Sequence, residues 1–390
     1  MSTRADTGRT AAVASFGGDN GSREHYLVVE PATSGDFASQ LASVTQQYTE
    51  LLRTLDLAPQ SAIFRRLYVS DVQNQVAAVR ASPLMAEEGS GPVAVSVVQQ
   101  PPLPANKVAL LAYHVDGDAS MTKRRLSPNL VEVRKAGQRH LWITGLRTGR
   151  ADAGVSSHDE TTTLLQLLTD LLAGRGGTLA ANCVRTWLYV KDVDVFYQGL
   201  VESRAAFFSR HGLTRNSHYI ASTGIEGACG GRYEVVALDA YSLLGPAAKQ
   251  VSYLNAFDLI CATHDYGVTF ERGTSVAYAD RAHHFISGTA SIDSRGRVVH
   301  PGNVLRQLGR ALQNVEGLLR SGGATFAEMM HLTVYLRDFT DFAMVRDCLK
   351  ERFPTLPVLV VLAPVCRPEW LIEVEGVAIA PSDQPGLAAF

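Results

Sequence analysis

The amino-acid sequence predicts a mixed α/β protein built from three copies of one unit. The first observation is a short pattern, an aromatic residue followed by Val or Leu, any residue, Asp and a hydrophobic residue, which begins at Tyr68, Tyr189 and Tyr335. The second is that each copy lies between two helix-like stretches. The third is the spacing, because anchors that recur 121 and then 146 residues apart indicate a repeated architecture.

The third copy shows the order of elements most clearly. Residues 284–288 have the composition of a short buried strand, and the apolar residues of 304–319 recur with the period of an amphipathic helix. A strand over 331–336 carries the anchor, and a second helix follows at about 342–353. Alternating polar and apolar residues over 370–380 predict a closing strand.

The second copy repeats this order. Its predicted elements are a strand at 141–145, a helix at 163–172, a strand at 184–190, a helix at 196–208 and a strand at 233–241. The recurrence of one order of elements supports the assignment of repeats.

The first copy is predicted to be truncated. It keeps a helix at 37–55, the anchor strand, a helix near 72–85 and a last strand near 108–115. Residues 1–23 are rich in Ser, Thr, Gly, Ala and Arg and predict a flexible tail.

Clusters of proline, glycine and polar residues indicate turns and linkers, and these predict the domain boundaries. We expect a truncated N-terminal repeat over 24–120, a central repeat over 121–245 and a C-terminal domain over 246–390. The C-terminal domain contains an insertion at 246–280. Within it, 267–272 and 274–278 predict a short hairpin that extends the third sheet and lines a site.

Composition favours chemistry on a small molecule. A net charge of −2 gives neither a basic surface for nucleic acid nor an acidic tail, and 46% hydrophobic residues are enough for two or three cores. The five cysteines lack CxxC spacing, which argues against a disulfide framework and a zinc site. With no signal-peptide run and no bilayer-length apolar stretch, we expect a cytoplasmic protein without a membrane partner.

No cofactor is expected from the motifs. The histidines lack His-x-x-x-His and His-Glu-x-x-His spacing, no Gly-x-Gly-x-x-Gly follows a strand, and no P-loop is present. The glycine-rich stretch 227–231 lacks the helix that phosphate binding needs. The sequence therefore indicates no metal, nucleotide or flavin.

Several segments resemble known families. Residues 285–290, 332–338 and 372–378 resemble the RidA/YjgF family, whose small domains form trimers with ligand sites in the clefts between subunits. This resemblance implies RidA/YjgF-like (chorismate-mutase-like) repeats that form an intrachain pseudo-trimer. Because such a chain closes its own interfaces, we expect a monomer.

Longer motifs resemble the chorismatase family, and they follow one another in the same order over roughly 24–381: residues 214–227, 266–274, 288–293 and 366–375. The resemblance implies that the substrate is chorismate and that pyruvate is released. It leaves open a hydroxybenzoate product, 3-hydroxybenzoate with or without 4-hydroxybenzoate, which would feed secondary metabolism. It also leaves open a hydrolytic branch that gives a dihydroxycyclohexadiene carboxylate. A third reading is a RidA-type enamine/imine deaminase or ligand-binding protein.

Glu373 is the candidate catalytic acid. Chorismate carries an acid-labile enol ether, and a carboxylic acid kept neutral by burial suits its protonation at pH 7. Strand alternation places Glu373 and Glu375 on one face, and the family resemblance implies that Glu373 is the acid. The alternative is that both glutamates face solvent on an amphipathic strand.

Cys366 is the second catalytic candidate. The branch that releases 3-hydroxybenzoate resembles this sequence in having a cysteine seven residues before the catalytic glutamate. A thiol there could act as a nucleophile toward a ring epoxide or cation and favour an aromatic product. Arg367 could lower the pKa of the thiol, and the alternative is a buried inert cysteine.

The candidates for substrate binding are mainly arginines, because a guanidinium offers two parallel donors to a carboxylate. By the resemblance, only the second copy keeps the arginine with which RidA proteins grip a carboxylate, and this suggests one working cleft. Each arginine could instead be a solvated surface charge. The candidates are Arg215, Tyr219 on the same strand face, Arg147, Arg232, the backbone N–H of Gly288 and the hydroxyl of Thr289.

Overall fold

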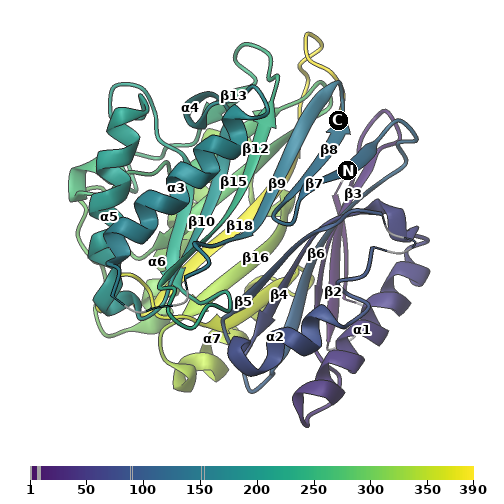
Figure 1. The fold of residues 1–390 in the computed structure, drawn as a ribbon, viewed down its shortest axis with the longest axis horizontal. Coiled ribbons are helices and arrows are strands. Elements are labelled where there is room, and N and C mark those ends of the chain that lie inside the picture. The colour runs from purple at the N-terminus through teal and green to yellow at the C-terminus, as the bar shows by residue number, and fades with distance from the viewer. Residues whose placement is uncertain (1, 7–9, 88, 90, 151, 153) are drawn as a thin grey trace.

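Three six-stranded sheets surround a common interior. The computed structural model describes residues 2–6, 10–87, 89, 91–150, 152 and 154–390. Figure 1 shows the helix pair α1 and α2 on one side of the molecule and the pair α3 and α5 on the other, with the strands between them.

The first sheet has the strand order β1-β2-β3-β6-β4-β5. Its strands are β1 (Ser2–Asp6), β2 (Ala11–Gly17), β3 (Arg23–Val29), β4 (Ala62–Val69), β5 (Ala94–Gln99) and β6 (Val108–Asp116). Its helices are α1 (Phe37–Thr54) and α2 (Val72–Arg80), with a 3₁₀ turn η1 (Pro59–Ser61).

The second sheet repeats this order as β7-β8-β9-β12-β10-β11. Its strands are β7 (Thr122–Ser127), β8 (Leu130–Lys135), β9 (Gln138–Leu146), β10 (Cys183–Val190), β11 (Ala221–Glu226) and β12 (Val236–Leu244). Its helices are α3 (Ser157–Ala173), α4 (Leu179–Asn182) and α5 (Val193–Arg210).

The third sheet has the same order, β13-β14-β15-β18-β16-β17. Its strands are β13 (Val251–Tyr253), β14 (Gly273–Ala277), β15 (Arg281–Ala290), β16 (Met329–Leu336), β17 (Val358–Leu362) and β18 (Ile372–Pro381). Its helices are α6 (Val304–Ser321) and α7 (Phe342–Arg352), with the 3₁₀ turns η2 (Thr263–Tyr266), η3 (Phe326–Glu328) and η4 (Phe339–Asp341). Three units with one topology make the predicted pseudo-trimer.

Local sequence explains where the long helices begin. The first long helix of each unit follows a polar residue whose side chain accepts a hydrogen bond from the backbone N–H three residues later, at Asp36, Ser156 and Asn303. In the first two units the apolar helix faces pack on their own sheets. The inner faces of all three sheets join α6 and α7 in one large core.

The strand registers relate positions in the three units. Tyr68 pairs with Ala109, Tyr189 with Ala237 and Tyr335 with Glu373, each across the same two strands of its sheet. Ala109, Ala237 and Glu373 are therefore equivalent positions.

Buried ion pairs connect the sheets across the interior. Arg66 on β4 contacts Asp239 on β12 at 3.1 Å, and Arg185 on β10 contacts Glu375 on β18 at 2.7 Å. All four side chains are almost fully buried. Because unpaired charges would be costly there, these pairs favour one arrangement of the three units.

The N-terminal expectations are wrong. Residues 11–17 and 23–29 form β2 and β3, and β3 pairs with β6 along its whole length. The first unit is thus complete rather than truncated, and most of the expected flexible tail over 1–23 belongs to its sheet. The small residues of 11–17 form a strand because β2 pairs with β3 along its whole length.

Only one of the two strands expected in a hairpin at 267–278 is present, namely β14. β14 pairs with β13, not with 267–272. β13 and β14 take the places of β1 and β2 in the third sheet, so the segment 246–280 supplies ordinary strands of the unit, with an excursion at 254–272 between them.

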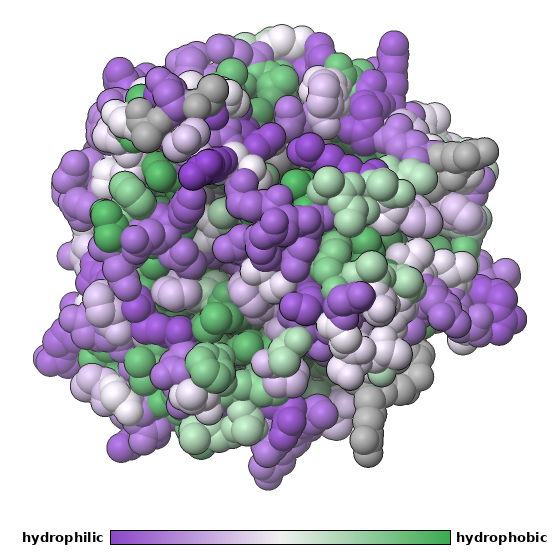
Figure 2. Space-filling view, turned by 60° about the horizontal axis from the view of Figure 1, so that its bottom comes forward, coloured by the Kyte–Doolittle hydropathy of each residue, from purple (hydrophilic) through white to green (hydrophobic). Residues whose placement is uncertain are grey.

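The surface is mixed in polarity. Figure 2 shows a face on which hydrophobic residues form several separate groups among hydrophilic ones. Within the described part of the chain, the exposed large hydrophobic side chains are Val195, Tyr233, Phe257, Leu305, Phe339 and Met344. In the same residues, no helix combines the length and the apolar character needed to cross a membrane.

Candidate active site

A small pocket lies between the second and third units. Helix α5 and strand β11 form one wall, and strands β15 and β18 form the other. The excursion 254–272 and the segment 363–371 close it. Its lining residues are Tyr197, Arg204, Ser222, Thr223, Gly224, Tyr266, Val268, Phe270, Arg272, Gly288, Ala290, Ile292, Cys366, Arg367, Trp370 and Glu373.

Glu373 brings a carboxyl group to the wall of this pocket. The side chain is only 5% exposed and lies on the inner face of β18. Burial, reinforced by the negative charge of Glu375, raises the pKa of Glu373 to about 8, although Arg185 and Arg272 oppose the shift. The carboxyl group is therefore protonated at neutral pH and can donate a proton.

Glycine at position 288 makes room for this carboxyl group. A Cβ atom on Gly288 would lie 2.0 Å from Oε1 of Glu373 and 3.0 Å from the Thr223 side chain. The backbone N–H of Gly288 donates to the Thr223 hydroxyl at 2.8 Å. Gly288 thus shapes the pocket by the absence of a side chain, and its predicted role as a backbone donor to substrate is not supported.

Glu375 has the opposite environment two residues along the same strand. Its carboxylate accepts hydrogen bonds from Arg185 at 2.7 Å, from Nε1 of Trp187 at 2.9 Å and from the Thr223 hydroxyl. Although burial raises the pKa of Glu375, Arg185 and Arg66 hold it below its ordinary value. β18 therefore carries one ionised and one neutral carboxyl group on the same face.

Cys366 lies in the segment before β18 and also lines the pocket. Burial and the charge of Glu373 raise the pKa of the thiol to about 12, against the smaller effects of Tyr197, Arg367 and Arg204. The expected lowering by Arg367 is thus outweighed by burial. The thiol is protonated and would need a base before it could act as a nucleophile.

Three arginines reach the pocket, and none of them was predicted as a substrate anchor. Arg272 donates from Nε and Nη2 to the Cys261 carbonyl, at 3.2 and 3.1 Å. Arg367 donates to the Tyr266 carbonyl at 3.2 Å. Within the described part of the chain, Nε and Nη2 of Arg204 are buried without a hydrogen-bond partner. A buried guanidinium with unused donors fits an anionic ligand.

The arginines predicted from the sequence lie elsewhere. Arg215 is exposed in a turn after α5 that is closed by its own hydrogen bonds. Arg232 is exposed and its guanidinium lies 5.5 Å from the Tyr233 ring. Arg147 forms an ion pair with Glu234 at 3.0 Å. None of the three lines the pocket that contains Glu373.

Tyr219 and Thr289 are also outside the pocket lining. Tyr219 is buried in the core of the second unit near Phe208, and Thr289 donates its hydroxyl to the Ser287 carbonyl at 2.8 Å. Alternation along β15 turns Thr289 to the face opposite Gly288. Of the eight predicted site residues, the pocket unites Glu373, Cys366 and Gly288.

A sequence signal for Arg204 existed. Leu200, Arg204 and Phe207 follow the spacing of the buried stripe of α5, and all three are buried. A charged residue on an apolar helix stripe is unusual and points to a function inside the fold. Arg272 lies within the segment 266–274 but has no comparable helix pattern.

Comparisons place the third unit among small α/β domains. A family model described as endoribonuclease L-PSP matches residues 275–380. A RutC family protein of Pyrococcus abyssi is 30% identical over 96 residues, which are 24% of this chain and 76% of that protein.

Other relatives match more of the chain. A chorismatase of Streptomyces rapamycinicus is 30% identical over 226 residues, 52% of this chain. A 3-hydroxybenzoate synthase of Streptomyces hygroscopicus is 30% identical over 105 residues, 24% of this chain. The chain spans 65% and 31% of the lengths of these two relatives, less than two thirds of either.

The whole fold has a match among solved structures. A crystal structure of a chorismatase superposes with a TM-score of 0.62 over 91% of this chain and 98% of that one, at 19% sequence identity. The arrangement of three sheets therefore occurs in a known protein.

Proposed function

The chain belongs to the RutC family, and from that premise we propose that it cleaves chorismate to pyruvate and a hydroxybenzoate. The observation that carries the proposal is a buried, protonated Glu373 in a pocket that also holds three arginines. Similarity to a chorismatase and to a 3-hydroxybenzoate synthase supports the choice of substrate.

The arginines match the charge of such a substrate. Chorismate has two carboxylates. To bind them in a closed pocket, the protein needs cations that are already buried, because little further free energy is then spent on removing their water. Arg204 has donors without partners among the described residues, and Arg272 and Arg367 keep donors beyond those used by backbone carbonyls. We assign Arg204 as the principal carboxylate anchor.

Glu373 supplies the proton that starts the reaction. Transfer of its proton to the methylene carbon of the enolpyruvyl group gives a cation stabilised by the ether oxygen. The bond between that oxygen and the ring carbon then breaks, and its electron pair becomes part of the pyruvate carbonyl group. Glu373 is left as a carboxylate.

The thiol of Cys366 directs the ring toward an aromatic product. The ring hydroxyl oxygen first bonds to the carbon that lost pyruvate and gives its proton to the Glu373 carboxylate, which forms an epoxide. The sulfur of Cys366 then opens the epoxide at the carbon that originally carried the hydroxyl group, and the epoxide oxygen takes the thiol proton, so the hydroxyl group now lies on the carbon that lost pyruvate. Loss of a ring proton and departure of the sulfur then restore aromaticity, giving 3-hydroxybenzoate without net uptake of water. Because the pKa of the free thiol is about 12, the thiol stays protonated until a proton acceptor is available. In the proposed order such an acceptor forms only after the first proton transfer.

Incubation of the pure protein with chorismate, with product identification by mass spectrometry, tests the proposal. We expect pyruvate and 3-hydroxybenzoate in equal amounts. A dihydroxycyclohexadiene carboxylate with pyruvate would place the protein in the hydrolytic branch. Unchanged chorismate together with turnover of an enamine or imine would overturn the proposal.

A further inference from the structure

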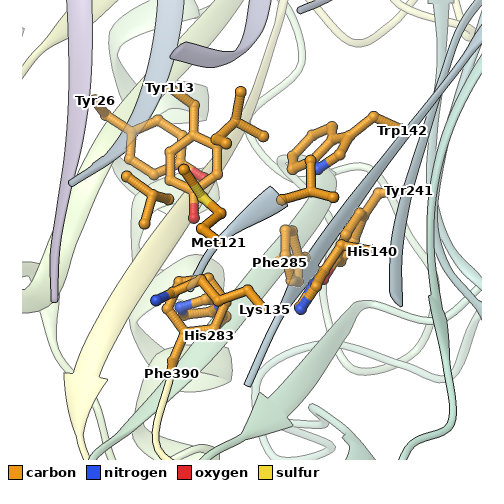
Figure 3. A pocket seen from close by; sticks show the side chains of 13 residues that line it. Tyr26, Tyr113, Met121, Lys135, His140, Trp142, Tyr241, His283, Phe285 and Phe390 are labelled. Carbon is orange, nitrogen blue, oxygen red and sulfur yellow. The ribbon is translucent and has the colours of Figure 1, made fainter. Parts of the chain in front are cut away.

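A second pocket lies where the inner faces of the three sheets meet. It is a small cavity closed by packed aromatic rings, and it shares no lining residue with the pocket of Glu373. Figure 3 shows aromatic side chains around it, with Phe390 and Lys135 close together on one side. The lining residues are Tyr26, Ile63, Tyr113, Val115, Met121, Val133, Lys135, His140, Trp142, Tyr241, His283, Phe285 and Phe390.

The registers place this pocket on the pseudo-threefold axis. Tyr26 pairs with Tyr113, Trp142 with Tyr241, and Phe285 with Val377, which are equivalent pairs in the three sheets. Each unit thus contributes an aromatic ring from its third strand. The next inward positions on those strands are Glu24, His140 and His283. We call this cavity the axial pocket.

The charges at the axial pocket are already paired. Lys135 contacts Asp118 at 2.7 Å, and Glu24 contacts both Arg281 at 2.7 Å and His283 at 2.9 Å. A ligand that brought its own charge would leave that charge or one of these groups without a partner in a buried site. The walls therefore favour a neutral molecule with an aromatic ring.

A histidine on the wall has a ring nitrogen without a hydrogen-bond partner of normal geometry among the described residues. Nδ1 of His140 lies 2.8 Å from the Tyr241 hydroxyl. Nε2 of His140 is buried and forms no hydrogen bond of normal geometry with the described part of the chain. Burial and the nearby His283 lower the pKa of His140 to about 3, so the imidazole is neutral and can exchange a hydrogen bond with a hydroxyl group.

The ring of Phe390 covers one side of the axial pocket. It packs edge-on against His283 and His140, with centroids 4.6 and 5.6 Å away, and Nζ of Lys135 lies 5.0 Å from its centre. The rest of the segment 382–390 is largely exposed. The segment is held by hydrogen bonds to 279–280 and by one from the Asn20 side chain to the Phe390 carbonyl at 2.8 Å. Such a segment opens at low free energy.

We propose that the axial pocket is a second ligand site, that its ligand is a neutral single-ring aromatic molecule with a hydroxyl group, and that the Phe390 ring is its displaceable cover. The ring and the ligand compete for the aromatic surroundings, so removal of the ring strengthens ligand binding. The site is independent of the reaction proposed for Glu373.

Calorimetric titration of the full chain with phenol tests this inference, with benzoate and cyclohexanol as probes of charge and aromaticity. We expect Phe390→Ala to bind phenol about tenfold more tightly than the unaltered protein, because the covered state no longer competes. Both versions should prefer phenol to benzoate and to cyclohexanol. Phe339→Ala, at a ring that is 62% exposed, is the matched control and should bind like the unaltered protein.

Equal phenol affinity in Phe390→Ala and Phe339→Ala, or a preference for benzoate, would overturn the inference. If Phe390→Ala does not fold, Phe390→Leu replaces it, and its smaller side chain should give an intermediate gain in affinity. A His140→Phe change in the same background should weaken phenol binding but leave toluene binding unchanged. Loss of phenol binding and toluene binding together would indicate a collapsed cavity rather than a lost hydrogen bond. That result would also count against the site.

Discussion

At Glu373, burial fixes the pH range in which the side chain can donate a proton. Its pKa of about 8 lies well above the ordinary value of 4.5, so the folded protein holds a proton there that the unfolded chain releases. The contribution of this group to stability is therefore complete below pH 4.5 and is lost as pH rises through 8. Activity that depends on the protonated acid should fall above pH 8.

The first prediction is that Glu373→Gln lowers turnover of chorismate by about 10²–10⁴, because the amide keeps the shape but has no transferable proton. Substrate binding should change little. The Tm of the variant should also fall less steeply between pH 5 and 8 than that of the unaltered protein. Steady-state kinetics and thermal melts over this range check both parts, and normal pyruvate release from the variant would refute the role.

The second prediction concerns Arg204. Arg204→Met should weaken chorismate binding by about 1.5–3 kcal/mol, since a charge-assisted contact is lost. The Tm should stay the same or rise, because a buried cation without a partner among the described residues is replaced by an apolar chain of similar length. Calorimetry with Arg215→Ala as the control tests this. The exposed Arg215 should contribute nothing, and a reversed ranking would move the substrate to another cleft.

The third prediction separates products at Cys366. Cys366→Ala should still release pyruvate, because the first proton transfer does not involve sulfur. The aromatic yield should fall relative to pyruvate, or the ring product should shift toward the dihydroxycyclohexadiene carboxylate. Chromatography of the products measures the ratio. A ratio identical to that of the unaltered protein would make the thiol part of the packing only.

At the scale of the element, strand β18 carries two carboxyl groups whose different partners give them different protonation states. Glu375 is saturated with donors from the second unit, whereas Glu373 two residues earlier faces the pocket. The charge of Glu375 reinforces the effect of burial on the pKa of Glu373. Glu375 is thus a positioning residue, which acts through its neighbour.

The fourth prediction is that Glu375→Gln moves the alkaline limb of the kcat profile to lower pH. Loss of the negative charge lowers the pKa of Glu373, and Arg185, no longer neutralised, lowers it further. Stability should drop by about 3–5 kcal/mol, as expected when a buried ion pair loses one partner. Glu132→Gln, at another buried and paired glutamate, is the control. It should lose stability without a shift in the limb.

Long periodic elements were predictable from the sequence, and short edge strands were not. Helices α1 and α6 begin where predicted and end one and two residues from the predicted ends, because their apolar stripes are strong. The strands β5, β11 and β17 were missed, since a few residues at a sheet edge carry little pattern. The strand β2 was missed because its three alanines, one serine and one glycine resemble a linker.

The site was predictable where a motif and alternation agreed. For Glu373, alternation along the strand predicted its face and the family resemblance implied its role as the acid, and the structure places its side chain at the pocket wall. Arg215 was chosen by its place in the sequence, yet a tight turn points it to solvent. Arg204 and Arg272 enter the pocket from elements of different units, and their convergence depends on how the sheets pack.

At the scale of the whole molecule, the three clefts are not equivalent. The positions that correspond to Glu373 are Ala109 and Ala237 in the other two units, so neither can supply the same acid. One working cleft is therefore expected. The same was predicted from Arg215, but that residue lies outside the pocket, and the support comes instead from the position of Glu373.

The fifth prediction is that the protein is a monomer of 42.1 kDa. The three sheets already face one another across a single core, and this uses the surface through which separate subunits would associate. Light scattering after size exclusion should give one mass at all concentrations. A mass near three times this value would show that the units exchange between chains.

The joining of three units in one chain has a further consequence for how such a site can arise. In a ring of identical subunits every substitution appears three times around the axis, so one new carboxyl group near the centre means three. With Glu373 and Glu375 tripled, six acidic groups would share one interior, and mutual repulsion would have to be offset at each of them. In a tandem chain a substitution in one unit leaves the other two units unchanged. One unit can acquire the acid while the other two keep alanine at the equivalent positions, and only one of these two forms the opposite wall of the pocket.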